Sequence, residues 1–136
     1  MPKVKINNAQ GLVQETGGGI ALFGATETLT AAGGGGTQIA PTTAVALCDS
    51  ANDAHIIKLP AIGGLEAGHT VVVANIDQSK EFHLVVAANS TRMNGIANTP
   101  VQVADVKEKT VITCIYSGAA NPGWIVTVGD QVTVPS

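Results

Sequence analysis

Short β-branched runs alternate with turn residues along most of this chain. From Thr37 onward, apolar runs recur about every 8 to 14 positions, the spacing that is typical of a β-sandwich or barrel. We expect strands over Thr42–Cys48, Ala54–Leu59, His69–Ile76, Phe82–Ala87, Val101–Val106, Thr110–Tyr116, Trp124–Val128 and Val132–Val134. Helix signals are scarce, since the best stretch, Asp105–Lys109, is too short to compete with its β-branched neighbours.

The turn residues between these runs refine the expected fold. Asn94-Gly95 is the sharpest signal, because both residue types tolerate the positive φ of a two-residue type I′ hairpin. Runs such as Val71–Val73 do not alternate, so both faces of those strands should be covered. The pattern predicts an all-β fold, an antiparallel β-sandwich of jelly-roll-like type, with its strand order left open.

The first 40 residues differ from the rest. Nine of the 16 glycines fall within the first 36 positions, including the tracts Gly17–Gly19 and Gly33–Gly36. Glycine tracts keep the backbone entropy of a segment high. We therefore expect an extended glycine-rich N-terminal arm over residues 1–40 and a sandwich domain over residues 41–136. Ile20, Leu22 and Phe23 are the expected apolar anchor of the arm.

The composition favours contact with other subunits. Only 12% of the 136 residues are charged, about half the share in an average domain, while 45% are hydrophobic. Much of the surface must therefore be small and uncharged, which suits burial in an oligomer. The net charge of −3 argues against a nucleic-acid partner. No apolar run approaches the roughly 18 residues of a membrane helix, so no membrane partner is expected. The start at Met1 without an apolar leader favours synthesis in a cytoplasm.

Histidines and cysteines offer the first candidate chemistry. His55, His69 and His83 are evenly spaced and would form a metal site only if three strands aligned them. Metal sites usually contain a close ligand pair, and none occurs here. Cys48 and Cys114 lie in apolar runs, which favours buried thiols over a nucleophile; a disulfide is the alternative. We expect no metal and no cofactor.

Other catalytic and binding motifs are incomplete. The segment Asp49–Asp53 lacks the central glycine and closing glutamate of a calcium loop. The glycine tracts lack the Gly-Lys-Ser/Thr of a phosphate loop. The carboxylates lie mostly in expected turns, where water keeps them unsuited to acid–base catalysis: Asp49, Asp53, Glu66, Asp77, Glu81 and Asp130. The sequence favours a structural or interaction protein over an enzyme.

A set of short segments resembles a known β-domain. These segments are Ile56–Pro60, a glycine-bounded turn through Gly68, His69–Asn75, Arg92–Gly95, Thr110–Cys114 and Gly123–Val126. In this order they look like a domain that recurs in virion proteins of tailed bacteriophages. The resemblance covers about residues 40–130. It implies a homotrimer, found either as a capsid decoration (cement) protein or as a module of tail or head fibres.

The resemblance and the composition together predict a structural virion protein on the capsid surface of a phage head, made in the host cytoplasm. Its expected partners are further copies of itself, as a homotrimer, and the major capsid protein, with interface contacts from Ile20, Leu22, Phe23 and Trp124. It would stabilise the capsid lattice non-covalently. The alternative is a short head or tail fibre, or a receptor-binding module that recognises a host surface.

Overall fold

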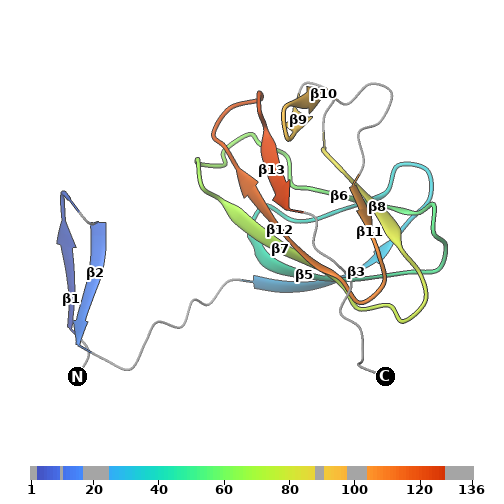
Figure 1. The fold of residues 1–136 in the computed structure, drawn as a ribbon, viewed down its shortest axis with the longest axis horizontal. Helices are drawn as coiled ribbons and strands as arrows, with labels where there is room; N and C mark the ends of the chain where they lie inside the picture. The colour runs from blue at the N-terminus through green and yellow to red at the C-terminus, as the bar shows by residue number, and fades with distance from the viewer. Residues whose placement is uncertain (1–2, 10, 17–24, 88–90, 98–103, 128–136) are drawn as a thin grey trace.

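A computed structural model describes residues 3–9, 11–16, 25–87, 91–97 and 104–127. Every regular element among them is a β-strand, so the described fold is all-β (Figure 1). The strands are β1 (Lys3–Asn7), β2 (Gly11–Thr16), β3 (Ala25–Ala31), β4 (Thr37–Gln38), β5 (Thr43–Ser50), β6 (Ile56–Lys58), β7 (Thr70–Asn75), β8 (Phe82–Val85), β9 (Arg92–Met93), β10 (Ile96–Ala97), β11 (Ala104–Val106), β12 (Val111–Tyr116) and β13 (Trp124–Thr127).

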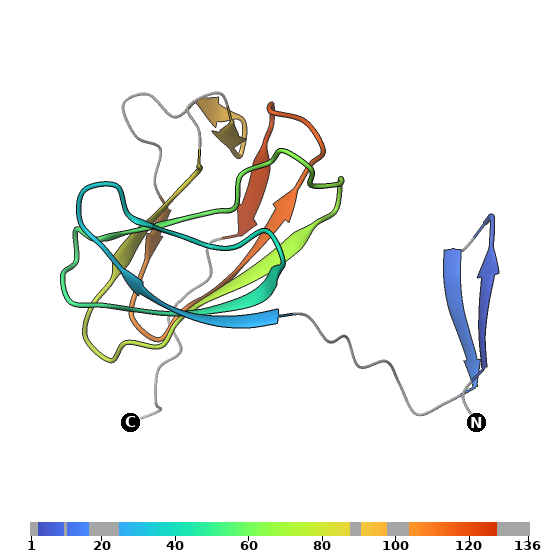
Figure 2. The ribbon, with the colours of Figure 1, turned by 180° about the vertical axis from the view of Figure 1, so that it is seen from behind.

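The strands form three sheets. The largest has seven strands in the order β10-β9-β13-β12-β7-β5-β3, and a second has four in the order β11-β8-β6-β4. The hairpin β1–β2 is a two-stranded sheet of its own. Side chains from both of the larger sheets contribute to one hydrophobic core, and Figures 1 and 2 show how the strands are arranged.

The strand pairing is mixed, so the expectation of a purely antiparallel arrangement is wrong. The parallel pairs are β3–β5, β5–β7, β4–β6, β6–β8 and β9–β13. From β3 to β8 the chain alternates between the seven-stranded and the four-stranded sheet. Each strand therefore returns to its own sheet in the same direction, and the strand of the opposite sheet serves as the crossover that parallel pairing needs.

Seven of the eight expected strands are confirmed in position, as β5, β6, β7, β8, β11, β12 and β13. The eighth, Val132–Val134, lies outside the described residues. Residues 25–40, expected in the arm, instead contribute β3 and β4 to the two larger sheets, and Ala31 and Ile39 are buried in the core. The hairpin β1–β2 occupies part of the remaining N-terminal segment.

The glycine tract Gly33–Gly36, which we expected within the extended arm, is a turn between β3 and β4. Gly34 and Gly36 have positive φ. A Cβ on Gly36 would lie 2.7 Å from Cγ2 of Ile56, so this glycine also permits close packing against the strand beside it. The tract therefore connects β3 of the seven-stranded sheet to β4 of the four-stranded sheet through a turn made of glycines alone.

The two-residue hairpin predicted at Asn94-Gly95 is confirmed. Both residues have positive φ and connect β9 to β10. The Asn94 side chain also bonds to β13: its Oδ1 accepts from the N–H of Val126, and its Nδ2 donates to the carbonyl of the same residue. This amide thereby mimics a strand backbone and holds the hairpin against the sheet.

The core draws on both large sheets. Its fully buried members include Trp124 and Cys114 from the seven-stranded sheet and Phe82, Leu84 and Ile57 from the four-stranded sheet. In the part of the chain that the structure describes, no helix is long and apolar enough to span a bilayer.

Candidate interaction surface

One side of the seven-stranded sheet turns away from the core and is almost free of charge. We call this side, over β3, β5, β7, β12 and β13, the outer face. Its residues follow from strand alternation and cross-strand register, because they pair with one another and alternate with side chains on the core side. They are Thr26, Thr28, Thr30, Val45, Leu47, Asp49, Thr70, Val72, Ala74, Val111, Thr113, Ile115, Ile125 and Thr127. Asp49 is the one charged side chain among them.

Cross-strand register joins the apolar side chains of the outer face into rows. Ile115 pairs with Ile125 at one end, and Val45 pairs with Val72 nearer the middle. Val111 is 57% exposed, Ile115 41% and Ile125 40%. Large apolar side chains at this exposure on neighbouring strands form a continuous surface, which is typical of protein contacts.

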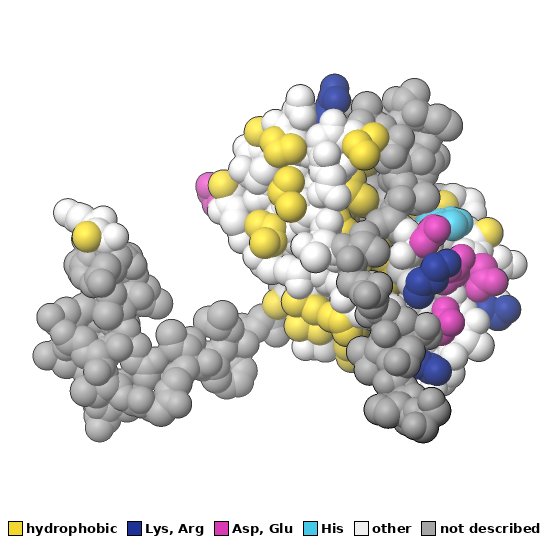
Figure 3. Space-filling model, viewed as in Figure 1, with side chains coloured by type: hydrophobic (Ala, Val, Ile, Leu, Met, Phe, Trp, Pro, Cys, Tyr) yellow, Lys and Arg dark blue, Asp and Glu magenta, His cyan; other side chains and the backbone are white. Residues whose placement is uncertain are grey.

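The charged side chains gather elsewhere. Figure 3 shows hydrophobic patches on the side of β7, β12 and β13, while acidic and basic groups cluster over β8 and β11. There, Nδ1 of His83 lies 2.7 Å from a carboxylate oxygen of Asp105, and Lys107 pairs with Glu81. The hydrogen bond to Glu81 raises the pKa of Lys107 above its usual range. The charged groups over β8 and β11 are therefore separate from the hydrophobic patches of the outer face in this view.

The expected interface residues lie in different situations. Ile20, Leu22 and Phe23 fall outside the described residues. Trp124 is fully buried within this chain, with its ring centroid 5.7 Å from that of Tyr116 and 6.4 Å from that of His69. A side chain so placed cannot touch a partner directly, so its contribution is to the core. Its Nε1 has no hydrogen-bond partner among the described atoms.

The three histidines have separate environments. Nδ1 of His55 lies 3.0 Å from the carbonyl of Ala31, His83 pairs with Asp105, and His69 packs against Trp124. Within the described ranges, no group of three or more His, Cys, Asp or Glu side chains could hold a metal ion. The structure does not bring the histidines together as ligands.

The cysteines are free and buried. Burial raises the pKa of each thiol from 9.0 to about 12, and the nearby carboxylates of Asp49 and Glu27 add to this effect at Cys48. The neutral thiol is a poor nucleophile. Both side chains act as small apolar residues of the core.

The turn carboxylate of Asp77 has a structural role. Its Oδ1 accepts hydrogen bonds from the backbone N–H groups of Ser79 and Lys80. These bonds, that to Ser79 first, lower the pKa of the Asp77 carboxyl below its usual range. The carboxylate therefore organises the loop between β7 and β8.

No pocket is present in the described part of the protein, so the site with the clearest physical character is a surface. No protein-family model matches the chain, and no curated protein matches it. The outer face could have been anticipated only in part. The non-alternating runs indicated strands that are apolar on both faces, but residue order alone does not say which strands share a sheet.

Proposed function

We propose that this protein is a structural virion component, a capsid decoration protein that binds the outside of a phage head and stabilises the capsid lattice non-covalently. The observation that carries the proposal is the uncharged outer face of the seven-stranded sheet. The segments that resemble phage virion β-domains support it, because they include parts of β6, β7, β9, β12 and β13. Four of these five strands belong to the sheet that carries the outer face.

The outer face gives a physical reason for assembly. Exposed apolar area costs about 25 cal/mol per Å² in water, so covering Val111, Ile115 and Ile125 would stabilise a complex. In the proposed assembly the two large sheets form a sandwich, and three copies close around a three-fold axis with their outer faces covered by one another. The low charge then allows close approach with Asp49 as the one charged side chain of this face to be desolvated.

Attachment to a head is the next step of the proposal. A trimer binds the capsid lattice through several equivalent contacts at once, and such multivalency raises affinity well above that of one contact. The major capsid protein is the proposed partner, and no turnover is required. The protein acts by holding neighbouring lattice subunits together.

The test is co-sedimentation with phage heads that lack this protein. Purified protein is mixed with such heads and, in parallel, with host cells, and the pelleted fraction is measured against total concentration. Saturable pelleting with heads, at a fixed number of copies per head, is the expected result. Pelleting with cells but not with heads would overturn the proposal in favour of a fibre or receptor-binding module.

A further inference from the structure

Among the described residues, β3 is the longest edge strand of the two large sheets. β3 is the last strand of the seven-stranded sheet and is seven residues long. The other edge strands, β10, β4 and β11, have two, two and three residues. In the view from behind, β3 runs in light blue along the margin of the domain (Figure 2).

The backbone groups on this edge can be assigned from two contacts. Ala32, just beyond β3, exchanges two backbone hydrogen bonds with Ile56 of the other sheet, so its N–H and carbonyl point away from β5. The carbonyl of Thr30 accepts from Oγ1 of Thr37, also on that side. Because the backbone alternates, Thr28 and Thr26 point their N–H and carbonyl groups the same way. Among the described strands, none pairs with them.

The edge has few of the features that normally prevent strand addition. Natural edge strands are protected by lysines, prolines, bulges or shortness. β3 has no lysine or proline, and its register irregularity lies at Ala25–Thr26, before Thr28. Its one charged side chain, Glu27, is held by Oγ1 of Thr43 at 2.6 Å and the N–H of Ala40 at 3.1 Å. The backbone groups of Thr26 and Thr28 on this edge can therefore accept an added strand.

The hairpin β1–β2 is a segment of this chain that needs a partner. A two-stranded sheet alone is only marginally stable in water, and Ile6 on this hairpin is 84% exposed. β2 has six residues, close to the length of β3. Eight residues, 17–24, join the two strands and can span at most about 30 Å. That reach is enough to arrive at an adjacent copy.

Within one chain, the structure keeps the hairpin and the edge of β3 in separate sheets. We propose that the edge of β3 accepts the β1–β2 hairpin of a neighbouring copy as added strands. This inference rests on the homotrimer of the proposed function. Each copy donates a hairpin to the next and receives one from the previous, which is a head-to-tail contact that closes as a ring of three.

Mixed isotope labelling tests this exchange in the full-length protein. Labelled and unlabelled chains are unfolded together, refolded and examined by isotope-filtered NMR. We expect intermolecular NOEs between the backbone of β3 in labelled copies and the hairpin of unlabelled copies. Slow amide exchange at Thr26 and Thr28 should accompany them. NOEs within one chain only, or fast exchange at both amides, would overturn the proposal.

A substitution on the edge provides a second measurement. Thr28→Pro removes an outward N–H while leaving the β3–β5 hydrogen bonds in place, since the Thr28 N–H points away from β5. We expect trimer association to weaken about tenfold or more, measured by dilution in native mass spectrometry. Thr28→Ala, which keeps the N–H, is the matched control: it loses the same outer-face side chain, so the proline variant should associate more weakly than this alanine variant. Equal association of the proline variant and the control would contradict the proposal.

The outcomes separate this inference from the proposed function. Trimers that bind heads but show no contact between the hairpin and β3 would remove strand exchange and leave the decoration role intact. Trimers with exchanged hairpins that do not pellet with heads would remove the decoration role and leave strand exchange intact. A monomer at every concentration tested would overturn the exchange between copies.

Discussion

Cys48 and Cys114 connect the stability of the core to pH. Their thiols have a folded-state pKa of about 12 because burial disfavours the thiolate, against 9.0 for an exposed thiol. Between these values the unfolded chain binds fewer protons than the folded chain, so the free energy of unfolding falls as pH rises. The expected loss is about 1 kcal/mol per pH unit for each thiol above pH 9. Below pH 9 the contribution is fully present.

Urea unfolding of the wild type and of a Cys48→Ala/Cys114→Ala variant at pH 8 and pH 10 measures this effect. Other alkaline titrations are common to both proteins and cancel in the comparison. The wild type should lose about 2 kcal/mol more than the variant over this range. Equal losses would show that the thiols do not carry the pH dependence.

Trp124 offers a second prediction at the same scale. The indole is fully buried in the core, so Trp124→Ala should lower the free energy of unfolding by about 3–5 kcal/mol. Because Nε1 has no hydrogen-bond partner among the described atoms, Trp124→Phe removes no bond and should cost less. Chemical denaturation of both variants provides the measurement. A negligible effect of the alanine variant would mean that the indole is not part of the core.

Strands and turns were predictable where local sequence decides them. The β-branched run of β12 and the positive-φ pair Asn94-Gly95 specify their conformations without distant partners. The strand β3 was not predicted, because its threonine-rich sequence is mostly polar and lies beside a glycine tract, which favours an extended arm over a strand of a sheet. Its place becomes evident only in the parallel register with β5, a contact between separated segments that residue order does not reveal.

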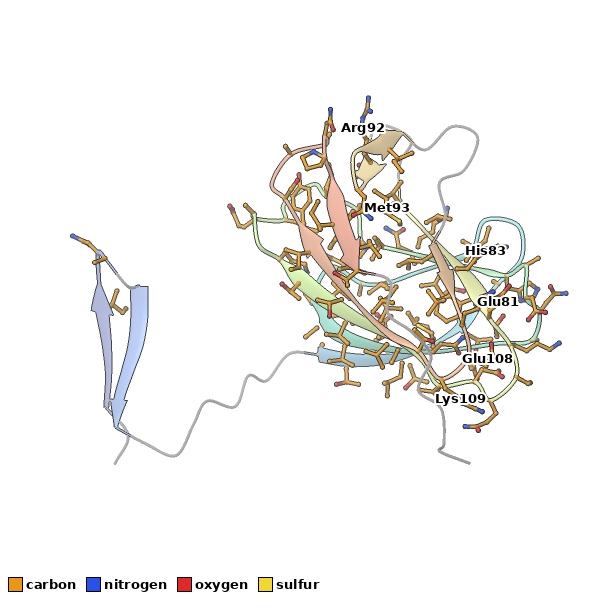
Figure 4. All side chains as sticks on the ribbon, viewed as in Figure 1. Glu81, His83, Arg92, Met93, Glu108 and Lys109 are labelled. Carbon is orange, nitrogen blue, oxygen red and sulfur yellow. The ribbon has the colours of Figure 1, made fainter. Side chains whose placement is uncertain are left out.

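A turn glycine tests how strongly such distant contacts constrain an element. Gly123 precedes β13, has positive φ, and a Cβ there would overlap the backbone carbonyl of Arg92. Figure 4 labels Arg92 and Met93 on β9, the strand that lies beside β13. Gly123→Ala should therefore destabilise the protein by several times the cost of a strained φ, which is about 1–2 kcal/mol.

Gly34→Ala is the matched control, because Gly34 also has positive φ but faces open space. Thermal and urea unfolding of the two variants would separate the overlap from the backbone strain. Similar losses in both would show that the approach of β9 to Gly123 does not constrain the turn.

At the scale of the whole molecule, composition anticipated the character of the candidate site but not its position. The 12% charged fraction indicated an uncharged surface. The position of that surface becomes known only from the structure, which places β3, β5, β7, β12 and β13 in one sheet. Asp49 is the one charged side chain among the outer-face residues of these strands. The expected contact residue Trp124 lies in the core instead, because strand alternation turns it inward and Ile125 outward.

The outer face leads to a prediction about assembly. Val111 is 57% exposed, so Val111→Lys should leave the fold unchanged while adding a charge that must be desolvated when copies associate. Native mass spectrometry of the wild type should show three times 13.7 kDa, and the lysine variant should shift toward the single chain. Ala51→Lys adds the same charge in the exposed turn between β5 and β6 and should retain the trimer. If both lysine variants retain the trimer, the outer face is not the contact; if Val111→Lys alone dissociates, the burial of this face drives assembly.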